Sequence, residues 1–240
     1  MKGLKDIKTD SRQEYSLAGL SMDKNRLISF NDAILAIIMT ILVLGLKVPD
    51  SPTLDAFWQM RFDYFAYAFS FFWLGELWIT QSSVFRNVKI INNRIVMSSL
   101  ILLFFCSMVP YFTLLASEYF YSRLIQAAFG AVMLLVNLSA LWIFTEISRA
   151  DPDNFLLTCY IRKMNRILIR SLFLKLIGII LTLTIWPPAT ILIVAIGFIQ
   201  VMVSKYRTDR KISCCLQEED HHPSGDDSKQ NQEQTENSTE

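Results

Sequence analysis

The sequence contains few of the residues on which enzymes rely. Its 240 residues include two histidines, and both of them, His221 and His222, lie in the polar C-terminal region. The apolar part of the chain has no HExxH pattern, no nucleophile elbow, no phosphate-binding loop and no paired carboxylates within one segment. Membrane hydrolases and transferases normally carry such a cluster at membrane depth or at the membrane edge. We therefore predict that the protein is not an enzyme and has no cofactor.

Cysteine is also scarce, and its four positions match neither a metal site nor a disulfide framework. Cys106 lies in an apolar run and Cys159 in a stretch that we interpret as a basic loop. Cys214 and Cys215 follow a basic stretch, which is compatible with lipidation or with two unmodified thiols. We interpret the two histidines as solvated side chains, so the sequence predicts no metal site.

Charged residues make up 19% of the chain and hydrophobic residues 52%, with a mean hydropathy of +0.33. Soluble domains are nearer 45–50% apolar and about 25% charged. The apolar residues concentrate between about Ala33 and Ser204. Because a spanning segment must satisfy its own backbone hydrogen bonds, this distribution predicts an all-α integral membrane protein.

Six apolar segments are long enough to be read as transmembrane helices. The last uncharged run, from Leu176 to Ser204, covers 29 residues, which is too long for one span of about 20. The sequence WPP at residues 186–188 divides it, because proline removes a backbone donor and clashes with the preceding turn. The predicted spans are residues 29–48, 62–85, 95–117, 124–145, 166–185 and 189–206.

Lysine and arginine alternate between rich and poor connections along the chain. They gather before the first span, between the second and third, between the fourth and fifth, and after the sixth. Positive charge marks the cytoplasmic side, so we predict both termini in the cytoplasm of a multi-pass protein of the cell (inner or plasma) membrane. The predicted organisation is a cytoplasmic segment (1–25), a six-helix membrane domain (26–207) and a disordered acidic tail (208–240).

Two charged residues fall well inside the predicted spans. Glu76 and Lys175 each lie about nine residues from the cytoplasmic end of their segments, or about 13 Å deep. Intramembrane charges are expensive and usually pair or serve a function. We hypothesise that the two residues pair or share a polar pocket. Snorkelling of Lys175 towards the headgroups is the alternative.

The first span has an aliphatic stripe with one hydroxyl in it. Phe30, Ile37, Thr40, Ile41 and Leu44 recur at helical spacing within about 100° of the helix circumference. Such a stripe is most often a packing seam between helices. The polar residues at the start of the same segment favour a role beyond packing.

Arg26, Asn31 and Asp32 stand at the cytoplasmic end of the first span, and Trp78 and Gln81 lie at the matching depth of the second. A buried carboxylate needs hydrogen-bond donors, and an indole and an amide provide them. We predict a polar lock that fixes the first helix against the second. Arg26 would meet Asp32 near the helix end or bridge to a neighbouring chain.

These residues also carry a family resemblance. The stretch RLISFND at residues 26–32 resembles the RxxxFSD motif of the endolysosomal potassium-channel family and its bacterial six-helix homologues. Residues 74–85, LGELWITQSSVF, resemble the GxxWxxHHxxF segment of that family, and residues 109–119 resemble its LPFPT…GEY segment. The resemblance covers about residues 24–207.

The resemblance implies a homotetramer of six-helix subunits in the lipid bilayer, with four copies of the first helix lining a pore for K⁺. The family has side-chain rings instead of a filter of backbone carbonyls. Those rings fall here on Ile37 as the gate, on Thr40 as a hydroxyl layer that transiently coordinates K⁺, and on Ile41 and Leu44 as further constriction. No nucleic-acid partner is implied.

Two departures from the family pattern stand out. Asn31 replaces the motif serine, and both residues can form hydrogen bonds. Gln81 and Ser82 replace the histidine pair after Trp78, so a response that depends on those histidines would be altered or lost.

Two alternatives to a passive potassium-permeable channel remain open at this point. One is a proton-coupled transporter that uses Glu76 and Lys175, although no repeat with broken half-helices is visible. The other is a membrane scaffold that transports nothing and in which the stripe on the first helix is a packing surface.

Overall fold

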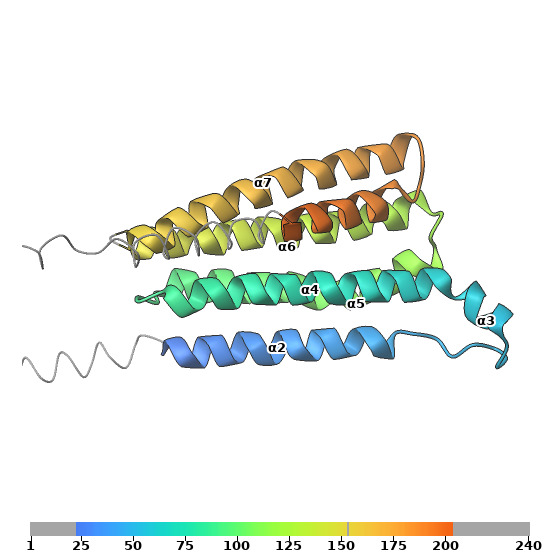
Figure 1. Ribbon diagram of the computed structural model, residues 1–240, viewed down its shortest axis with the longest axis horizontal. Helices are drawn as coiled ribbons and strands as arrows, with labels where there is room; N and C mark the ends of the chain where they lie inside the picture. The colour runs from blue at the N-terminus through green and yellow to red at the C-terminus, as the bar shows by residue number, and fades with distance from the viewer. Residues whose placement is uncertain (1–22, 153, 204–240) are drawn as a thin grey trace, which may run out of the picture. The chain divides into compact units, whose positions relative to one another are not determined.

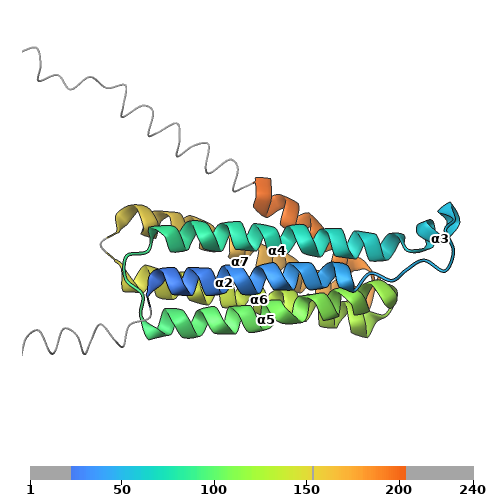
Figure 2. The ribbon, with the colours of Figure 1, turned by 90° about the horizontal axis from the view of Figure 1, so that it is seen from below.

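A computed structural model describes residues 23–152 and 154–203, and every described element is a helix or a connection between helices. Figures 1 and 2 show long helices that run roughly parallel or antiparallel to one another. The labelled helices are α2 (Lys24–Leu44), α3 (Leu54–Gln59), α4 (Arg61–Asn87), α5 (Asn93–Glu118), α6 (Arg123–Ala150) and α7 (Phe155–Thr184). A further apolar helix covers Ala189–Val203.

Polar residues at the helix starts explain several of these boundaries. The Asp23 side chain accepts a hydrogen bond from the Asn25 backbone N–H at the start of α2. Asn92 accepts one from Ile95 at the start of α5, and Asn154 accepts one from Leu157 at the start of α7. Such caps satisfy backbone donors that have no partner within the helix.

Four of the described helices, α2, α5, α6 and α7, are long and apolar enough to cross a membrane. The prediction of an all-α membrane protein is confirmed at this level. α4 has 27 residues but a less apolar composition, and the helix Ala189–Val203 is shorter. Each of the six predicted spans nevertheless coincides with a helix, and the chain turns at residues 185–188, as the WPP sequence predicts.

The predicted boundaries are wrong in four places. The first helix begins at Lys24 instead of residue 29 and ends at Leu44 instead of residue 48, with Gly45 at its C-cap. The fourth continues from residue 145 to Ala150, and the fifth begins at Phe155 instead of residue 166. The predicted basic loop between them is therefore mostly helix, and Cys159 lies on α7. Hydropathy loses the helix there because arginine and lysine, although hydrophilic, are good helix formers. The short helix α3 was not predicted.

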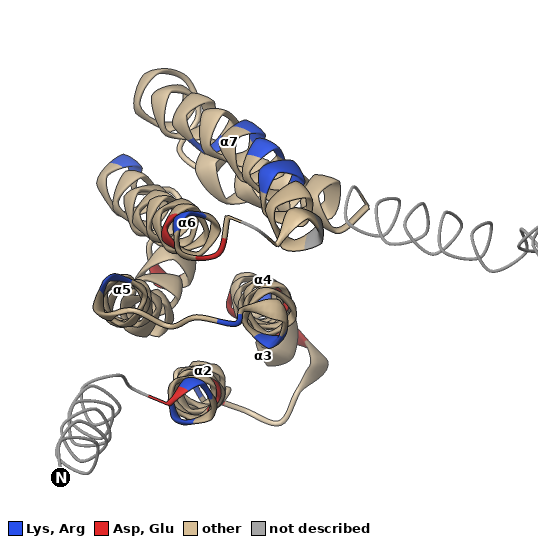
Figure 3. Cartoon of the chain, turned by 90° about the vertical axis from the view of Figure 1, so that its left-hand side faces the viewer, with Lys and Arg blue, Asp and Glu red and all other residues tan. Residues whose placement is uncertain are grey.

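The helices of residues 23–201 pack in layers. α2 packs against α4 and α5, α5 packs against α6, and α6 packs against α7. The view along the helices places α2 and α7 on opposite sides of α4 and α5 (Figure 3). Within the most apolar 18 residues of each helix, 28% of α2 and of α7 is buried, compared with 56% of α6. α6 is thus the central helix of the chain, while α2 and α7 are peripheral.

The helix Ala189–Val203 folds back along α7 and is joined to it by hydroxyl groups. Thr182 accepts a hydrogen bond from the Thr190 backbone N–H at 2.9 Å, and the two hydroxyls lie 2.6 Å apart. α6 approaches the same place through Gly130, where an added Cβ would lie 2.7 Å from side-chain atoms of Ile179 and Thr190. Glycine is therefore required at this crossing for steric reasons.

The predicted N-terminal segment and acidic tail lie largely or wholly outside the described residues. The same holds for the predictions about Cys214, Cys215, His221 and His222.

Candidate functional site

α2 has two chemically distinct faces. One face is buried against the neighbouring helices, and its residues are Leu27, Asn31, Leu35, Ile38 and Leu42. These positions recur every three or four residues, as expected for one side of a helix. The opposite face is therefore left uncovered by the rest of the chain.

The uncovered face carries the whole predicted pore stripe. Ile37 is 57% exposed and Leu44 80% exposed, and Ile41, Phe30 and Thr40 are also exposed. The spacing from Ile37 to Leu44 is seven residues, or about 10 Å along the helix. A single chain thus presents an aliphatic surface with one hydroxyl near its middle.

The Thr40 hydroxyl is held by its own helix. Its Oγ1 donates a hydrogen bond to the carbonyl oxygen of Ile37 at 2.8 Å. A hydroxyl has one donor and two acceptor lone pairs, so this bond uses the proton and leaves the oxygen able to act as a ligand. The geometry suits an oxygen that coordinates a cation.

Asp32 and Trp78 form the predicted contact between α2 and α4. The indole Nε1 of Trp78 donates to Oδ1 of Asp32 at 2.8 Å. Both side chains remain partly exposed. A hydrogen bond to a carboxylate is stronger than one between neutral groups, and this bond fixes the rotation of α2 relative to α4.

Asn31 and Gln81 depart from the predicted lock. Asn31 is 3% exposed and accepts a hydrogen bond from the Ser99 hydroxyl of α5 at 2.7 Å, so its partner lies on α5 and not on α4. Gln81 is 2% exposed, and neither of its amide atoms has a hydrogen-bond partner within the described residues. Gln81 therefore lies next to the lock in sequence without bonding to it.

The structure does not bring Arg26 to Asp32. Arg26 is exposed, and within the described residues no ion pair joins the two. Six residues at 100° each place the two side chains about 120° apart around the helix, so they cannot meet on α2 itself. A contact of Arg26 with a neighbouring chain remains a proposal.

A second contact, which was not predicted from the sequence, lies at the C-terminal end of α4. The Lys24 ammonium of α2 donates to the carbonyl oxygens of Arg86 at 2.8 Å and Val88 at 2.7 Å. Asn154, the N-cap of α7, donates to the carbonyl of Asn87 at 3.2 Å. A cation at a helix C-terminus satisfies unpaired carbonyls and complements the helix dipole. Lys24 precedes the apolar run, so hydropathy gave no signal for it.

Glu76 and Lys175 line one small cavity between α4, α6, α7 and the helix Ala189–Val203, with a volume of about 30 Å³. Lys175 is 3% exposed, so the snorkelling alternative is wrong. Its Nζ donates to the Ser171 hydroxyl at 3.2 Å and lies 5.6 Å from the centre of the Trp73 ring. Glu76 accepts a hydrogen bond from Thr80 at 2.7 Å. The cavity is large enough for a water molecule.

The opposite ends of the helices are joined by further polar contacts. Lys47, in the connection after α2, forms an ion pair with Glu118 at the end of α5. The hydrogen bond to Glu118 raises the pKa of Lys47 above its ordinary value. Deeper in the bundle, the hydroxyls of Ser70 on α4 and Thr113 on α5 lie 2.8 Å apart. Polar pairs therefore tie α2, α4 and α5 together along their length.

Known proteins resemble this chain in sequence and in fold. The family model for the endosomal/lysosomal potassium channel TMEM175 matches residues 26–110, which include most of α2, all of α3 and α4, and most of α5. The potassium channel HX13_20290 of Chryseobacterium sp. (strain P1-3) is 32% identical over 133 residues, covering 55% of this chain and 69% of that protein. The potassium channel B446_29190 of Streptomyces collinus is 31% identical, over 50% of this chain and 63% of that protein.

A solved structure shares the fold. The crystal structure of a lysosomal potassium-selective channel TMEM175 homologue from Chamaesiphon minutus matches with a TM-score of 0.60 at 19% sequence identity. The match covers 77% of this chain and 97% of that one. At this identity the match speaks for the fold alone, and the curated relatives supply the relationship. The chain belongs to the TMEM175 potassium channel family.

Proposed function

We propose that this protein is a potassium-permeable channel in which four copies of the chain surround a pore lined by α2. The observation that carries the proposal is the uncovered face of α2, an aliphatic stripe with one hydroxyl, in a chain whose relatives are potassium channels. Those relatives favour a channel over a proton-coupled transporter or a scaffold.

The subunit that we propose has six spans, namely α2, α4, α5, α6, α7 and the helix that begins at Ala189, with both termini in the cytoplasm of the cell membrane. The alternation of basic and non-basic connections supports this orientation. Tight contacts with the neighbouring helices support α4 as a span despite its less apolar composition.

Permeation is passive in this proposal. A ring of four Ile37 side chains closes the pore by excluding water, because a narrow apolar constriction dewets. Thr40 lies one turn further along α2, where four hydroxyl oxygens replace part of the hydration shell of K⁺. Ile41 and Leu44 narrow the pore beyond that ring.

The lock residues have a supporting role. Asp32 and Trp78 hold α2 at one rotation, and Asn31 and Ser99 tie it to α5. Together they keep the stripe turned away from the rest of the subunit and towards the proposed axis. Arg26, exposed at the same end, is placed to contact an adjacent subunit.

Cysteine accessibility tests the proposal. The full chain, with its four native cysteines replaced, is reconstituted in liposomes loaded with K⁺, and a single cysteine is introduced at Ile37. A water-soluble thiol reagent should then block K⁺ flux, and oxidation should join chains in a species no larger than a tetramer. The matched control is a cysteine at Ile180, which is equally exposed but lies on α7. If the reagent blocked K⁺ flux through the Ile180 cysteine variant and not through the Ile37 variant, the proposal that α2 lines the pore would be contradicted.

A further inference from the structure

The outward face of α7 carries a line of arginines. Arg162, Arg166 and Arg170 are exposed and spaced four residues apart, so they lie one above the other along the helix. α7 contains no aspartate or glutamate. Figure 3 shows the basic residues along α7, on the far side of the bundle from α2. This face therefore carries three guanidinium groups, and its own helix has no acidic side chain.

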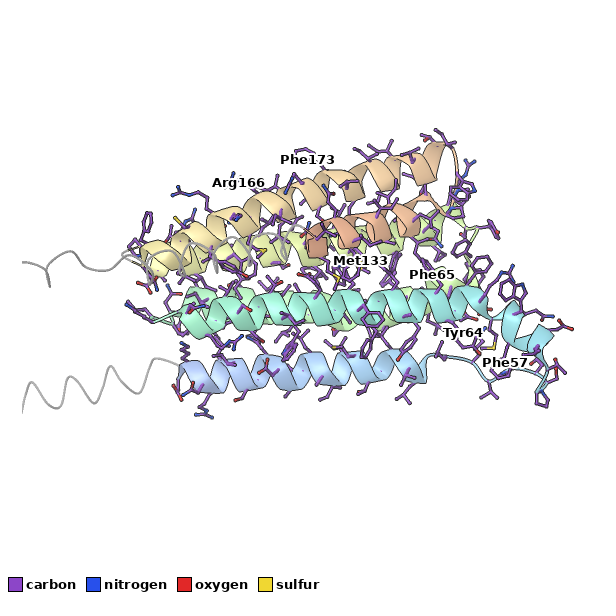
Figure 4. All side chains as sticks on the ribbon, in the orientation of Figure 1. Phe57, Tyr64, Phe65, Met133, Arg166 and Phe173 are labelled. Carbon is purple, nitrogen blue, oxygen red and sulfur yellow. The ribbon has the colours of Figure 1, made fainter. Side chains whose placement is uncertain are left out.

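The same face becomes apolar further along. Phe173 is 60% exposed, and Ile177 and Ile180 are also exposed at the same helical spacing. In Figure 4 the labelled side chains of Arg166 and Phe173 both point away from α4. A continuous line of side chains therefore passes from guanidinium groups to large apolar groups.

The length of α7 sets the depth of these residues. Its 30 residues extend about 45 Å, whereas the hydrocarbon core is about 30 Å thick. Counting about 20 residues back from Thr184, where the helix ends, reaches the region of Met164. Arg162 and Arg166 then lie at the cytoplasmic headgroup level. Arg170 lies about 6 Å deeper than Arg166, so its long side chain can still extend to the headgroups.

The position of α7 in the assembly rests on the proposed function. If α2 faces the central axis, α7, on the opposite side of α4 and α5, faces the perimeter and meets lipid (Figure 3). The partner of its outward face is then a bilayer component and not a second subunit.

We propose that Arg162, Arg166 and Arg170 bind the phosphate of an anionic phospholipid in the cytoplasmic leaflet. Arginine is suited to this role because its planar guanidinium donates two parallel hydrogen bonds to phosphate oxygens. One acyl chain of the same lipid lies along Phe173, Ile177 and Ile180, where the apolar surface continues. Charge and apolar surface together select a lipid over a soluble phosphate compound.

Lipid selectivity measured by electron spin resonance tests this proposal. The full chain is reconstituted in phosphatidylcholine bilayers that contain a trace of spin-labelled phosphatidylglycerol or spin-labelled phosphatidylcholine. We expect the protein to prefer phosphatidylglycerol by about threefold or more, since each basic side chain near the surface adds attraction. In R162Q/R166Q/R170Q the preference should fall below about twofold. The charge-conserving variant with three lysines should keep part of it.

A matched control removes the same charge elsewhere on the cytoplasmic side. Arg86, Lys89 and Arg94 are exposed there and lie outside α7, so R86Q/K89Q/R94Q should keep the wild-type preference. Equal losses in both triple variants would overturn the proposal, because they would indicate a diffuse surface potential. Displacement of the lipid by inorganic phosphate would also overturn it. If the α7 triple variant does not reconstitute, the three single variants replace it, and each should lose part of the preference.

The measurement is independent of conduction. A protein that lacks K⁺ flux but retains the arginine-dependent preference would contradict the proposed function and leave the lipid site standing. A protein that conducts K⁺ but lacks the lipid preference would contradict the lipid site and leave the proposed function standing.

Discussion

α2 and α7 are equally exposed on opposite sides of the chain, yet their exposed faces differ in chemistry. Both are 28% buried in their most apolar 18 residues. The free face of α2 carries isoleucine, leucine and one threonine from the middle of the helix to its C-terminal end, with its single arginine at the N-terminal end. The free face of α7 carries three arginines and then bulky apolar side chains.

The difference indicates that the two exposed faces of one subunit suit different partners. A face with small variation in side-chain size and one mid-depth hydroxyl suits contact with copies of itself around an axis. A face that is cationic at headgroup depth and apolar below suits lipid. Polar bonds hold both helices, through Asp32 and Asn31 on α2 and through Thr182 on α7. α7 is held in addition by its close approach to Gly130 of α6.

The largest effect is expected at Ile37. In the proposed pore, Ile37→Asn keeps the constriction hydrated, so we expect K⁺ leak through reconstituted protein to rise about tenfold or more. The equivalent change on α7, Ile180→Asn, should leave the flux per protein unchanged. If both variants leak alike, the distinction between the two faces fails.

The packing of α7 is tested next. Gly130→Ala places a methyl group where the nearest atoms of Ile179 and Thr190 are 2.7 Å away. Overpacking of this kind costs about 1–3 kcal/mol, so the midpoint of thermal unfolding in detergent should fall. Gly197→Ala is the control, because the nearest atom to its added Cβ is the Ser171 hydroxyl at 3.9 Å, and it should be neutral or slightly stabilising.

Thr40 offers a matched pair with Thr184. Each hydroxyl donates to a carbonyl of its own helix at 2.8 Å, that of Ile37 and that of Ile180 respectively. We expect Thr40→Ala to lower the K⁺ over Na⁺ permeability ratio about fivefold, the equivalent of about 1 kcal/mol. Reversal potentials under bi-ionic conditions measure this ratio. Thr184→Ala should not change it, and Thr40→Ser should restore most of it.

The smallest effect is expected at the lock. Trp78→Phe removes the N–H that bonds Asp32 and keeps most of the ring, and Asp32→Asn removes the charge. Because both groups are partly exposed, a double-mutant cycle on unfolding should give a coupling of only about 0.5–1 kcal/mol. Additive losses would show that the bond does not hold α2. Trp58→Phe, at an exposed indole on α3, serves as the control.

Hydropathy and charge were enough to predict where the helices lie, because membrane insertion selects for apolar length. They failed at the start of α7, where Arg162 and Arg166 are hydrophilic but helical. Hydropathy and charge also could not identify which side chains form hydrogen bonds between helices. Depth placed both Asp32 and Asn31 near Trp78 and Gln81 without choosing between them. Asp32 bonds Trp78, whereas Asn31 bonds Ser99 on α5, a choice that depends on which face of α2 meets which helix.

The proposed pore stripe was predicted from helical spacing together with the family motif, and its exposure could not be read from the sequence. A spacing of three and four residues describes a packing seam and a pore wall equally well. Burial of the alternate face, from Leu27 to Leu42, distinguishes the two faces of α2.

The polar contacts of α4 also bear on how the chain is made. α4 is 27 residues long but is not among the four described helices that are apolar enough to cross a membrane, since Glu76, Thr80 and Gln81 oppose its partition out of the translocon. Lys24 and Asp32, which bond the C-terminal part of α4 and the residue after it, precede it in the chain. They are synthesised first, so the α2 partners of these bonds are already present when α4 follows.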